Sequence, residues 1–150
     1  MGKCYYINIG GLTLQGAQTV CSSAFGSNTS GIVFEPATLA INDAVLQAAS
    51  KLYFPEEYWI GVNNGNLTYH SNGNPVSIAS IPWSSGQPNS EDDCVYTYPT
   101  SKLWYSQTCD QIAYGTICEV TSKTITTTTA TTTTTTPKSN YMGLTKHIVL

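Results

Sequence analysis

Five cysteines restrict the fold of this 150-residue chain more than any other feature, because all of them lie in its first 120 residues. They stand at positions 4, 21, 94, 109 and 118, and no two of them form a Cys-x-x-Cys pair. Since the chain has only two histidines, a zinc site is not expected and the pattern favours disulfides. Five cysteines allow fifteen arrangements with two bridges and one free thiol, and counting does not choose among them.

A threonine tract separates these cysteines from the end of the chain. Twelve of the 22 threonines fall between Thr121 and Thr136. All nine acidic residues and three of the six lysines precede the tract, so residues 1–120 carry a formal charge of −6. We therefore predict one domain over residues 1–120, a Thr-rich, mucin-like linker over 121–137 and an unstructured tail over 138–150.

Charge and hydropathy exclude two kinds of partner. Three lysines on an acidic domain cannot form the basic face that neutralises nucleic-acid phosphates. No apolar run approaches about 18 residues, so we expect no membrane insertion.

Disulfides require an oxidising compartment, and the start of the chain has no apolar signal segment. We expect a secreted or extracellular protein whose signal peptide is not present in this chain, with N-glycosylation in the triplets at Asn28 and Asn66.

Hydrophobic patterning predicts an α+β domain. Apolar spacing after Thr13, a suitable N-cap, predicts a helix that ends near Phe25, and a second helix is expected to start with Asn42 as its cap and to end near Leu52. The other expected segments are strands at 4–9, 58–62, 94–98, 103–105 and 114–118, and a long irregular loop at 76–90. A loop of that length in a compact domain is usually functional or disordered.

The order of the motifs resembles that of C-type lectin-like domains over about 115 residues. The matching segments are Cys4-Tyr5-Tyr6, Leu14, Cys21, Trp59-Ile60-Gly61-Val62, Trp83, Gly86-Gln87-Pro88-Asn89, Asp92-Asp93-Cys94-Val95, Trp104, Cys109 and Ile117-Cys118-Glu119. The resemblance implies two helices, small antiparallel sheets and a long irregular loop region, stapled by disulfides.

The resemblance also implies how the cysteines pair. Cys21 would bridge to Cys118 across the whole domain, and Cys94 would bridge to Cys109 near the long loop. Cys4 corresponds to the second half of an N-terminal hairpin bridge whose first half would lie upstream. We therefore expect the N-terminal hairpin to be incomplete and Cys4 to be unpaired in this chain.

Lectins of this family bind sugar in the long loop through a calcium ion, which prefers six to eight oxygen ligands. Gln87-Pro88-Asn89 fills the first ligand motif, and Glu91 or Asp92 can fill the acidic position. The Trp-Asn-Asp motif that supplies the remaining ligands is absent, because Tyr105 and Ser106 follow the tryptophan. Calcium at Gln87, Asn89 and Asp92 would therefore be held weakly or not at all.

Two functions remain as hypotheses, and neither is enzymatic. The first is carbohydrate recognition with weak or no calcium dependence, and the second is a calcium-independent protein-binding module without sugar activity. The partners would be glycans, a glycoprotein or a protein.

The tripeptide Gln87-Pro88-Asn89 mixes galactose-type and mannose-type patterns, so no sugar is predicted. The same tripeptide can also be a proline turn that binds nothing. His70 is expected to be exposed in a turn. The candidate ligand-binding residues are Gln87, Asn89, Glu91, Asp92, Tyr105 and Ser106.

Overall fold

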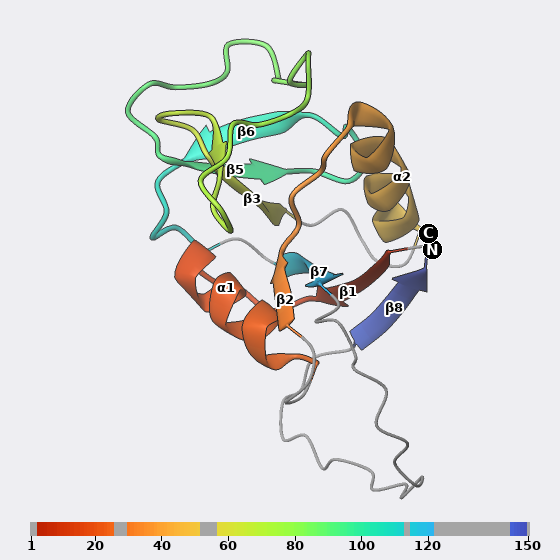
Figure 1. The fold of residues 1–150 in the computed structure, drawn as a ribbon. Helices are drawn as coiled ribbons and strands as arrows, with labels where there is room; N and C mark the ends of the chain where they lie inside the picture. Colours follow the sequence, from red (N-terminus) through yellow and green to blue (C-terminus); the bar gives the residue numbers. More distant parts are fainter. Residues whose placement is uncertain (1–2, 26–29, 52–56, 113–114, 122–144, 150) are drawn as a thin grey trace, which may run out of the picture.

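Two helices and eight strands form the described part of the chain (Figure 1). The computed structural model describes residues 3–25, 30–51, 57–112, 115–121 and 145–149. In chain order the elements are β1 (Cys4–Asn8), α1 (Leu14–Ser23), β2 (Ser30–Val33), α2 (Leu39–Ser50), β3 (Tyr58–Asn63), β4 (Thr68–Tyr69), β5 (Cys94–Thr97), β6 (Trp104–Gln107), β7 (Gly115–Thr121) and β8 (Thr145–Val149). The predicted α+β class is confirmed. Neither described helix is long and apolar enough to cross a bilayer.

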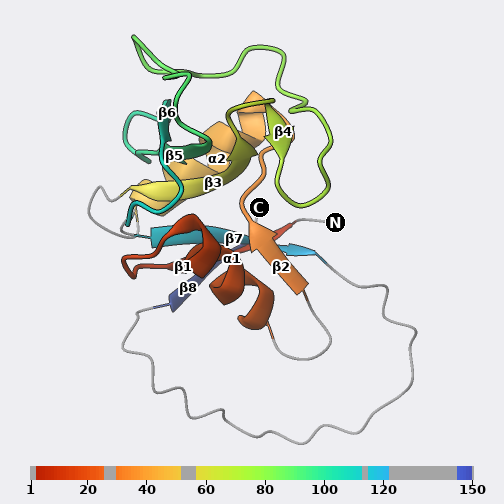
Figure 2. The same ribbon diagram turned by 90° about the vertical axis from the view of Figure 1, so that its left-hand side faces the viewer.

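The strands join into one mixed sheet of order β6-β5-β3-β7-β1-β8, with β2 paired to β7 and β4 paired to β3. The β3–β7 contact is parallel and covers two residue pairs, whereas the other strand pairs are antiparallel. This short contact makes one mixed sheet, where the resemblance implied small antiparallel sheets. Figure 2 shows the long loop, in green, at one end of the molecule and β8 toward the other end.

The helix starts show one correct and one wrong cap prediction. Thr13 caps α1, and its Oγ1 accepts a hydrogen bond of 3.2 Å from the Gly16 N–H. The second helix begins at Leu39, because Thr38 is its cap. Asn42 is instead a fully buried helix residue whose Oδ1 accepts a 2.9 Å bond from Trp104 Nε1.

The core has three parts, and each supports a different region of the sheet. One lies between α2 and the sheet and contains Phe34 and Tyr58. The second surrounds Trp59 below α1, and the Trp59 Nε1–H donates to the Leu12 carbonyl at 2.7 Å. The third lies under the long loop and contains Ile60, Val62, Tyr69, Ile78, Val95 and Trp104. The loop is therefore seated on a packed apolar base.

The two disulfides follow the predicted pairing. Cys21 on α1 bonds to Cys118 on β7, and Cys94 on β5 bonds to Cys109 after β6. Cys4, at the start of β1, is free and exposed.

The prediction of an unstructured tail is wrong for residues 145–149, which form β8 and pair antiparallel with β1. Composition alone did not reveal this strand, because its hydrogen-bonding partner is the outer edge of β1, more than a hundred residues earlier in the chain. The other tail residues, the Thr-rich linker after Thr121 and Asn28 lie outside the described residues.

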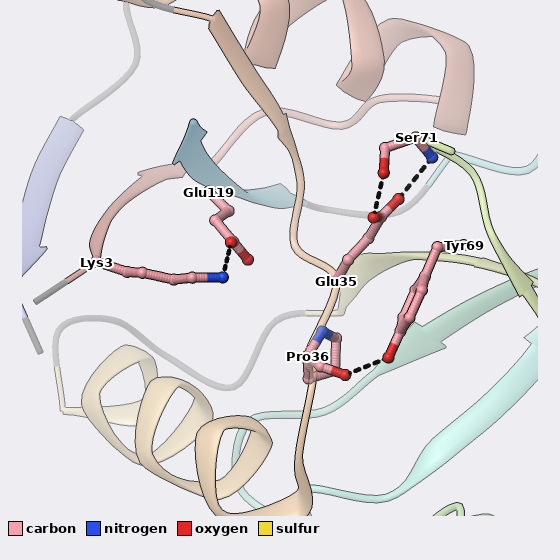
Figure 3. Close-up of polar contacts among 6 residues, drawn as sticks. All are labelled: Lys3, Glu35, Pro36, Tyr69, Ser71 and Glu119. Carbon is pink, nitrogen blue, oxygen red and sulfur yellow. Dashed lines mark hydrogen bonds and ion pairs between the residues drawn. The ribbon is translucent and has the colours of Figure 1, made fainter. Parts of the chain in front are cut away.

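Two acidic side chains are buried, Glu35 just after β2 and Glu119 on β7 (Figure 3). Glu35 accepts hydrogen bonds from the Ser71 N–H at 2.8 Å and from the Ser71 hydroxyl at 2.5 Å. Gly61 is needed beside it, because a Cβ at that position would lie 2.7 Å from Glu35 Cγ. Glu119 forms an ion pair with Lys3.

Glu35 gives a prediction for the pH dependence of stability. Burial raises the pKa of its carboxyl, although the two Ser71 hydrogen bonds act in the opposite direction. The folded state therefore binds a proton at higher pH than the unfolded state does, and stability is lost as pH rises through the folded pKa. We expect Glu35→Gln to remove this loss, so that its unfolding free energy relative to wild type increases from pH 4 to pH 7 in urea titrations.

Ser71→Ala is the matched control for this titration. It keeps the carboxyl but removes the hydroxyl that stabilises the charged form, so the pH-dependent loss should become larger than in wild type. A constant difference between Glu35→Gln and wild type at all pH values would contradict the assignment to Glu35.

Candidate functional site

The long loop between β4 and β5 is folded back onto β6 before it reaches the predicted ligand residues. The Ser84 N–H donates to the Trp104 carbonyl at 3.0 Å, and the Trp83 and Trp104 rings meet edge to face at 6.0 Å. Gly86 has a φ of 79°, a conformation that favours glycine, and the Gln87-Pro88 peptide is cis. The Ser84 hydrogen bond and the contact between the two tryptophan rings bring Gln87 and the residues after it next to β6.

Ser106 is the centre of the predicted site. Its N–H donates to Gln87 Oε1 at 2.9 Å, and its Oγ accepts from the Asn89 N–H at 2.7 Å. The single hydroxyl proton lies within reach of two acceptors, Gln87 Oε1 at 2.8 Å and Asp92 Oδ2 at 3.0 Å. Four of the six predicted residues are thus brought together around one buried hydroxyl group.

Asn64 holds the backbone of the same loop segment through three hydrogen bonds. Its Nδ2 donates to the Asn89 carbonyl at 2.9 Å and to the Asp92 carbonyl at 2.7 Å, and its N–H donates to the Asp93 carbonyl at 2.8 Å. The side chain is buried, with 8% of the residue exposed. The turn after β3 therefore positions the backbone of the ligand loop.

Exposed polar residues adjoin the Ser106 network. Asn89, Glu91 and Asp93 are exposed, whereas Gln87 and Asp92 are half-buried. Glu91 is joined to the network through its backbone, because its N–H donates to Asn89 Oδ1 at 3.2 Å. Its carboxylate is therefore at the surface.

Tyr105 lies on the other face of the sheet from the predicted site. Residues alternate along β6, so Trp104 and Ser106 are buried while Tyr105 faces the opposite side. There its ring stacks on Tyr96 at 5.3 Å and meets Tyr98 edge to face at 5.3 Å. The Tyr98 hydroxyl donates to the Glu57 carboxylate, and this bond raises the pKa of Tyr98. We call Tyr96, Tyr98 and Tyr105 the tyrosine surface.

Two adjoining pockets of about 190 and 450 Å³ lie between α1 and the turn after β4. They share Gln18 and His70, and none of the six predicted ligand residues lines either of them. His70 is half-buried rather than exposed as predicted, and burial lowers its pKa. The long-loop site is a separate surface.

Comparison with known families agrees with the arrangement of loop and disulfides. The profile of the family described as "Lectin C-type domain" matches residues 11–120. The chain belongs to the C-type lectin domain family. A search of curated protein sequences found no match.

Solved structures share the C-type lectin fold with this chain. The C-type lectin CEL-I from Cucumaria echinata is 20% identical with a TM-score of 0.68, covering 81% of this chain and 91% of the other. The carbohydrate-recognition domain of the mouse scavenger receptor C-type lectin is 20% identical with a TM-score of 0.64, covering 83% and 93%. A calcium-independent type II antifreeze protein is 19% identical with a TM-score of 0.59, covering 78% and 85%.

C-type lectin domains often bind calcium and are generally not enzymes, but the side chains at this site do not fit a calcium ion. Gln87 Oε1 and Asp92 Oδ2, two of the oxygens that would bind it, are bridged by the Ser106 hydroxyl. Asp92 is the only carboxylate in that network, whereas calcium takes six to eight oxygens. Among the described residues, no three His, Cys, Asp or Glu side chains form a group that could hold a metal.

Asn64 is the site residue whose role the sequence did not reveal. Asn64 lies in the turn after β3, a position that suits its residue type because Asn and Gly mark turns. Its two side-chain hydrogen bonds cross to residues 25 and 28 positions away. The only sequence signal was a pair of amides, Asn63 and Asn64, after the apolar run at 58–62.

Proposed function

We propose that this domain recognises carbohydrate at the long-loop surface through direct hydrogen bonds and without a resident calcium ion. The observation that supports it is the group of exposed amide and carboxylate side chains, Asn89, Glu91 and Asp93, beside the Ser106 network. Sugar hydroxyls donate and accept at once, so they pair with amide N–H groups and carboxylate oxygens. Residues 76–93 of the described chain carry no exposed large hydrophobic side chain.

The Ser106 network supports the calcium-independent form of this proposal. Gln87, Asn89 and Asp92 are ordered by a hydroxyl and an amide of the protein itself, so the loop needs no cation to hold its conformation. A pre-ordered loop reduces the entropy that ligand binding must overcome. One structural relative is a carbohydrate-recognition domain and another is calcium-independent, so both properties occur on this fold.

Asn89→Ala tests the site. The Asn89 side chain is exposed, and its Oδ1 accepts one bond from the N–H two residues on. We expect at least a tenfold loss of glycan affinity, the equivalent of about 1.4 kcal/mol, with a melting temperature within about 2 °C of wild type. A glycan array, with and without chelator, would identify the ligand, and calorimetry would give the affinities.

Asn72→Ala is the matched control. Asn72 is also exposed, and its Oδ1 also accepts from the N–H two residues on, at 2.8 Å, but in the turn after β4. It should leave glycan affinity unchanged. An array without any glycan binding would contradict the proposal. Glycan binding that disappears with chelator would contradict its calcium-independent part.

A protein ligand is the second candidate, and the tyrosine surface favours it. Tyrosine is enriched at protein interfaces, since its ring buries apolar area and its hydroxyl stays polar. Tyr96, Tyr98 and Tyr105 are half-buried on the face opposite the Ser106 network. A negative glycan array together with a protein ligand lost in Tyr98→Ser, but retained in Asn89→Ala, would favour this candidate.

The two disulfides support an extracellular location, because such bonds persist in oxidising compartments. We extend the proposal to the chain around the domain, with the Thr-rich stretch as an O-glycosylated linker and Asn28 and Asn66 as N-glycosylation sites. Asn66 lies on an exposed turn, with its Oδ1 accepting from the Thr68 hydroxyl at 2.6 Å.

A further inference from the structure

The outer edge of β1 is filled by a strand from the far end of the chain. β8 pairs with β1 over five residue pairs, from Cys4 opposite Val149 to Asn8 opposite Thr145. The two strands lie side by side in both ribbon views (Figures 1 and 2). In the sheet order β8 stands last, so among the described strands it pairs with β1 alone.

By contrast, β1 is held firmly from its inner side. It pairs with β7 over four residue pairs, and Tyr5 and Ile7 are buried with 2% and 0% of each residue exposed. Lys3, directly before the strand, forms an ion pair with Glu119 on β7 (Figure 3). If β8 leaves, β1 should therefore stay in place and present a row of unpaired N–H and C=O groups.

The connection to β8 is long enough to reach a neighbouring molecule. Thr121 and Thr145 are separated by 23 residues. A connection of this length spans at most about 80 Å when fully extended. A tether of a few tens of residues limits the effective concentration of its strand to the millimolar range, so the strand of another copy competes once copies reach a similar local concentration.

We propose that the outer edge of β1 is a strand-acceptor site for the β8 segment of a second copy of this chain. Exchange replaces each β1–β8 pairing within one molecule by the same pairing between molecules, so it needs no new contacts. At micromolar concentration each molecule's own β8 fills its β1 edge. At millimolar local concentration the β8 segments of different copies exchange and join the copies. The edge lies away from the long loop in Figure 2, so joined copies would keep their ligand-binding surfaces open and gain avidity.

Val149→Cys in the full chain tests the acceptor edge and the exchange together. Residue 149 is the register partner of Cys4, which is free and exposed, so a disulfide between positions 4 and 149 reports the β1–β8 pairing. We would oxidise the folded protein with oxidised glutathione at about 10 µM and about 1 mM. Peptide mapping and non-reducing gels should show bonds within one chain at the lower concentration and a several-fold larger interchain fraction at the higher one.

Ile148→Cys is the control, because position 148 is opposite Tyr5 rather than Cys4. It should give much less of either bond. Absence of the bond between positions 4 and 149 at both concentrations would overturn the acceptor site. Bonds that stay within one chain at 1 mM, or an equal interchain yield from Ile148→Cys, would overturn the exchange. Light scattering of the wild-type chain at both concentrations gives a second measurement, in which a monomer at 1 mM also overturns the exchange.

Discussion

Replacing Cys21 and Cys118 together with alanine is expected to lower the unfolding free energy by about 4.7 kcal/mol. The bridge spans a sequence separation of 97 residues, and in the chain-entropy model a loop of that length restricts the unfolded state by this amount. Single domains are stable by roughly 5–15 kcal/mol in total, so this variant should be near the limit of folding. Urea denaturation followed by tryptophan fluorescence would measure the loss.

Two further variants separate loop length from the chemistry of cysteine. Cys94→Ala/Cys109→Ala opens a separation of 15 residues and should cost about 3 kcal/mol, less than the first pair. Cys4→Ala changes a free, exposed residue and should cost less than about 0.5 kcal/mol. If the 94–109 variant were the less stable of the two, loop entropy would not be the main contribution of these bridges.

The fold was predictable wherever a local rule and the long-range arrangement agree. Thr13 caps α1 as its residue type suggests, because nothing distant competes for its hydroxyl. Asn42 is an equally good cap by type, yet it lies inside α2. There its amide lies between the Trp104 ring and the Lys102 carbonyl, about 60 residues away, so the tertiary contact overrides the local preference.

The last strand was unpredictable for a different reason. Residues 145–149 form a single short segment, and such a segment has no stable structure of its own. The segment becomes a strand by pairing with the outer edge of β1, and its own sequence does not indicate that partner. Predicting it would have required knowing that β7 pairs with one edge of β1 and leaves the other edge open.

In the candidate site, the sequence predicted which segments meet but not the face of the sheet on which each side chain lies. The motif order correctly grouped Gln87, Asn89 and Asp92 with Ser106, since loop and strand order fix which segments meet. Tyr105 was grouped with them by its position in the motif. Strand alternation separates it, because a residue next to the buried Trp104 and Ser106 must face the other side of the sheet.

Ser106→Asp should convert the site into one that responds to calcium. The new carboxylate would face Asp92, whose Oδ2 lies 3.0 Å from the present Ser106 hydroxyl, in a position where only 6% of the residue is exposed. Without calcium, two adjacent carboxylates and a lost donor should lower the unfolding free energy by about 2–4 kcal/mol. A calcium ion between them would relieve this repulsion. With a dissociation constant of about 1 mM, 10 mM calcium restores about 1.4 kcal/mol.

Thermal unfolding in 10 mM calcium and in chelator would measure this response, with magnesium as the control for ionic strength. Ser106→Asn is the matched variant, because it has the same size without the charge and should lose stability without regaining it in calcium. The wild-type melting temperature should be the same in calcium and in chelator, since its hydroxyl already bridges Gln87 and Asp92. An equal calcium response in wild type would show that this hydroxyl does not prevent calcium binding. No response in Ser106→Asp would show that more than one missing carboxylate separates this loop from a calcium site.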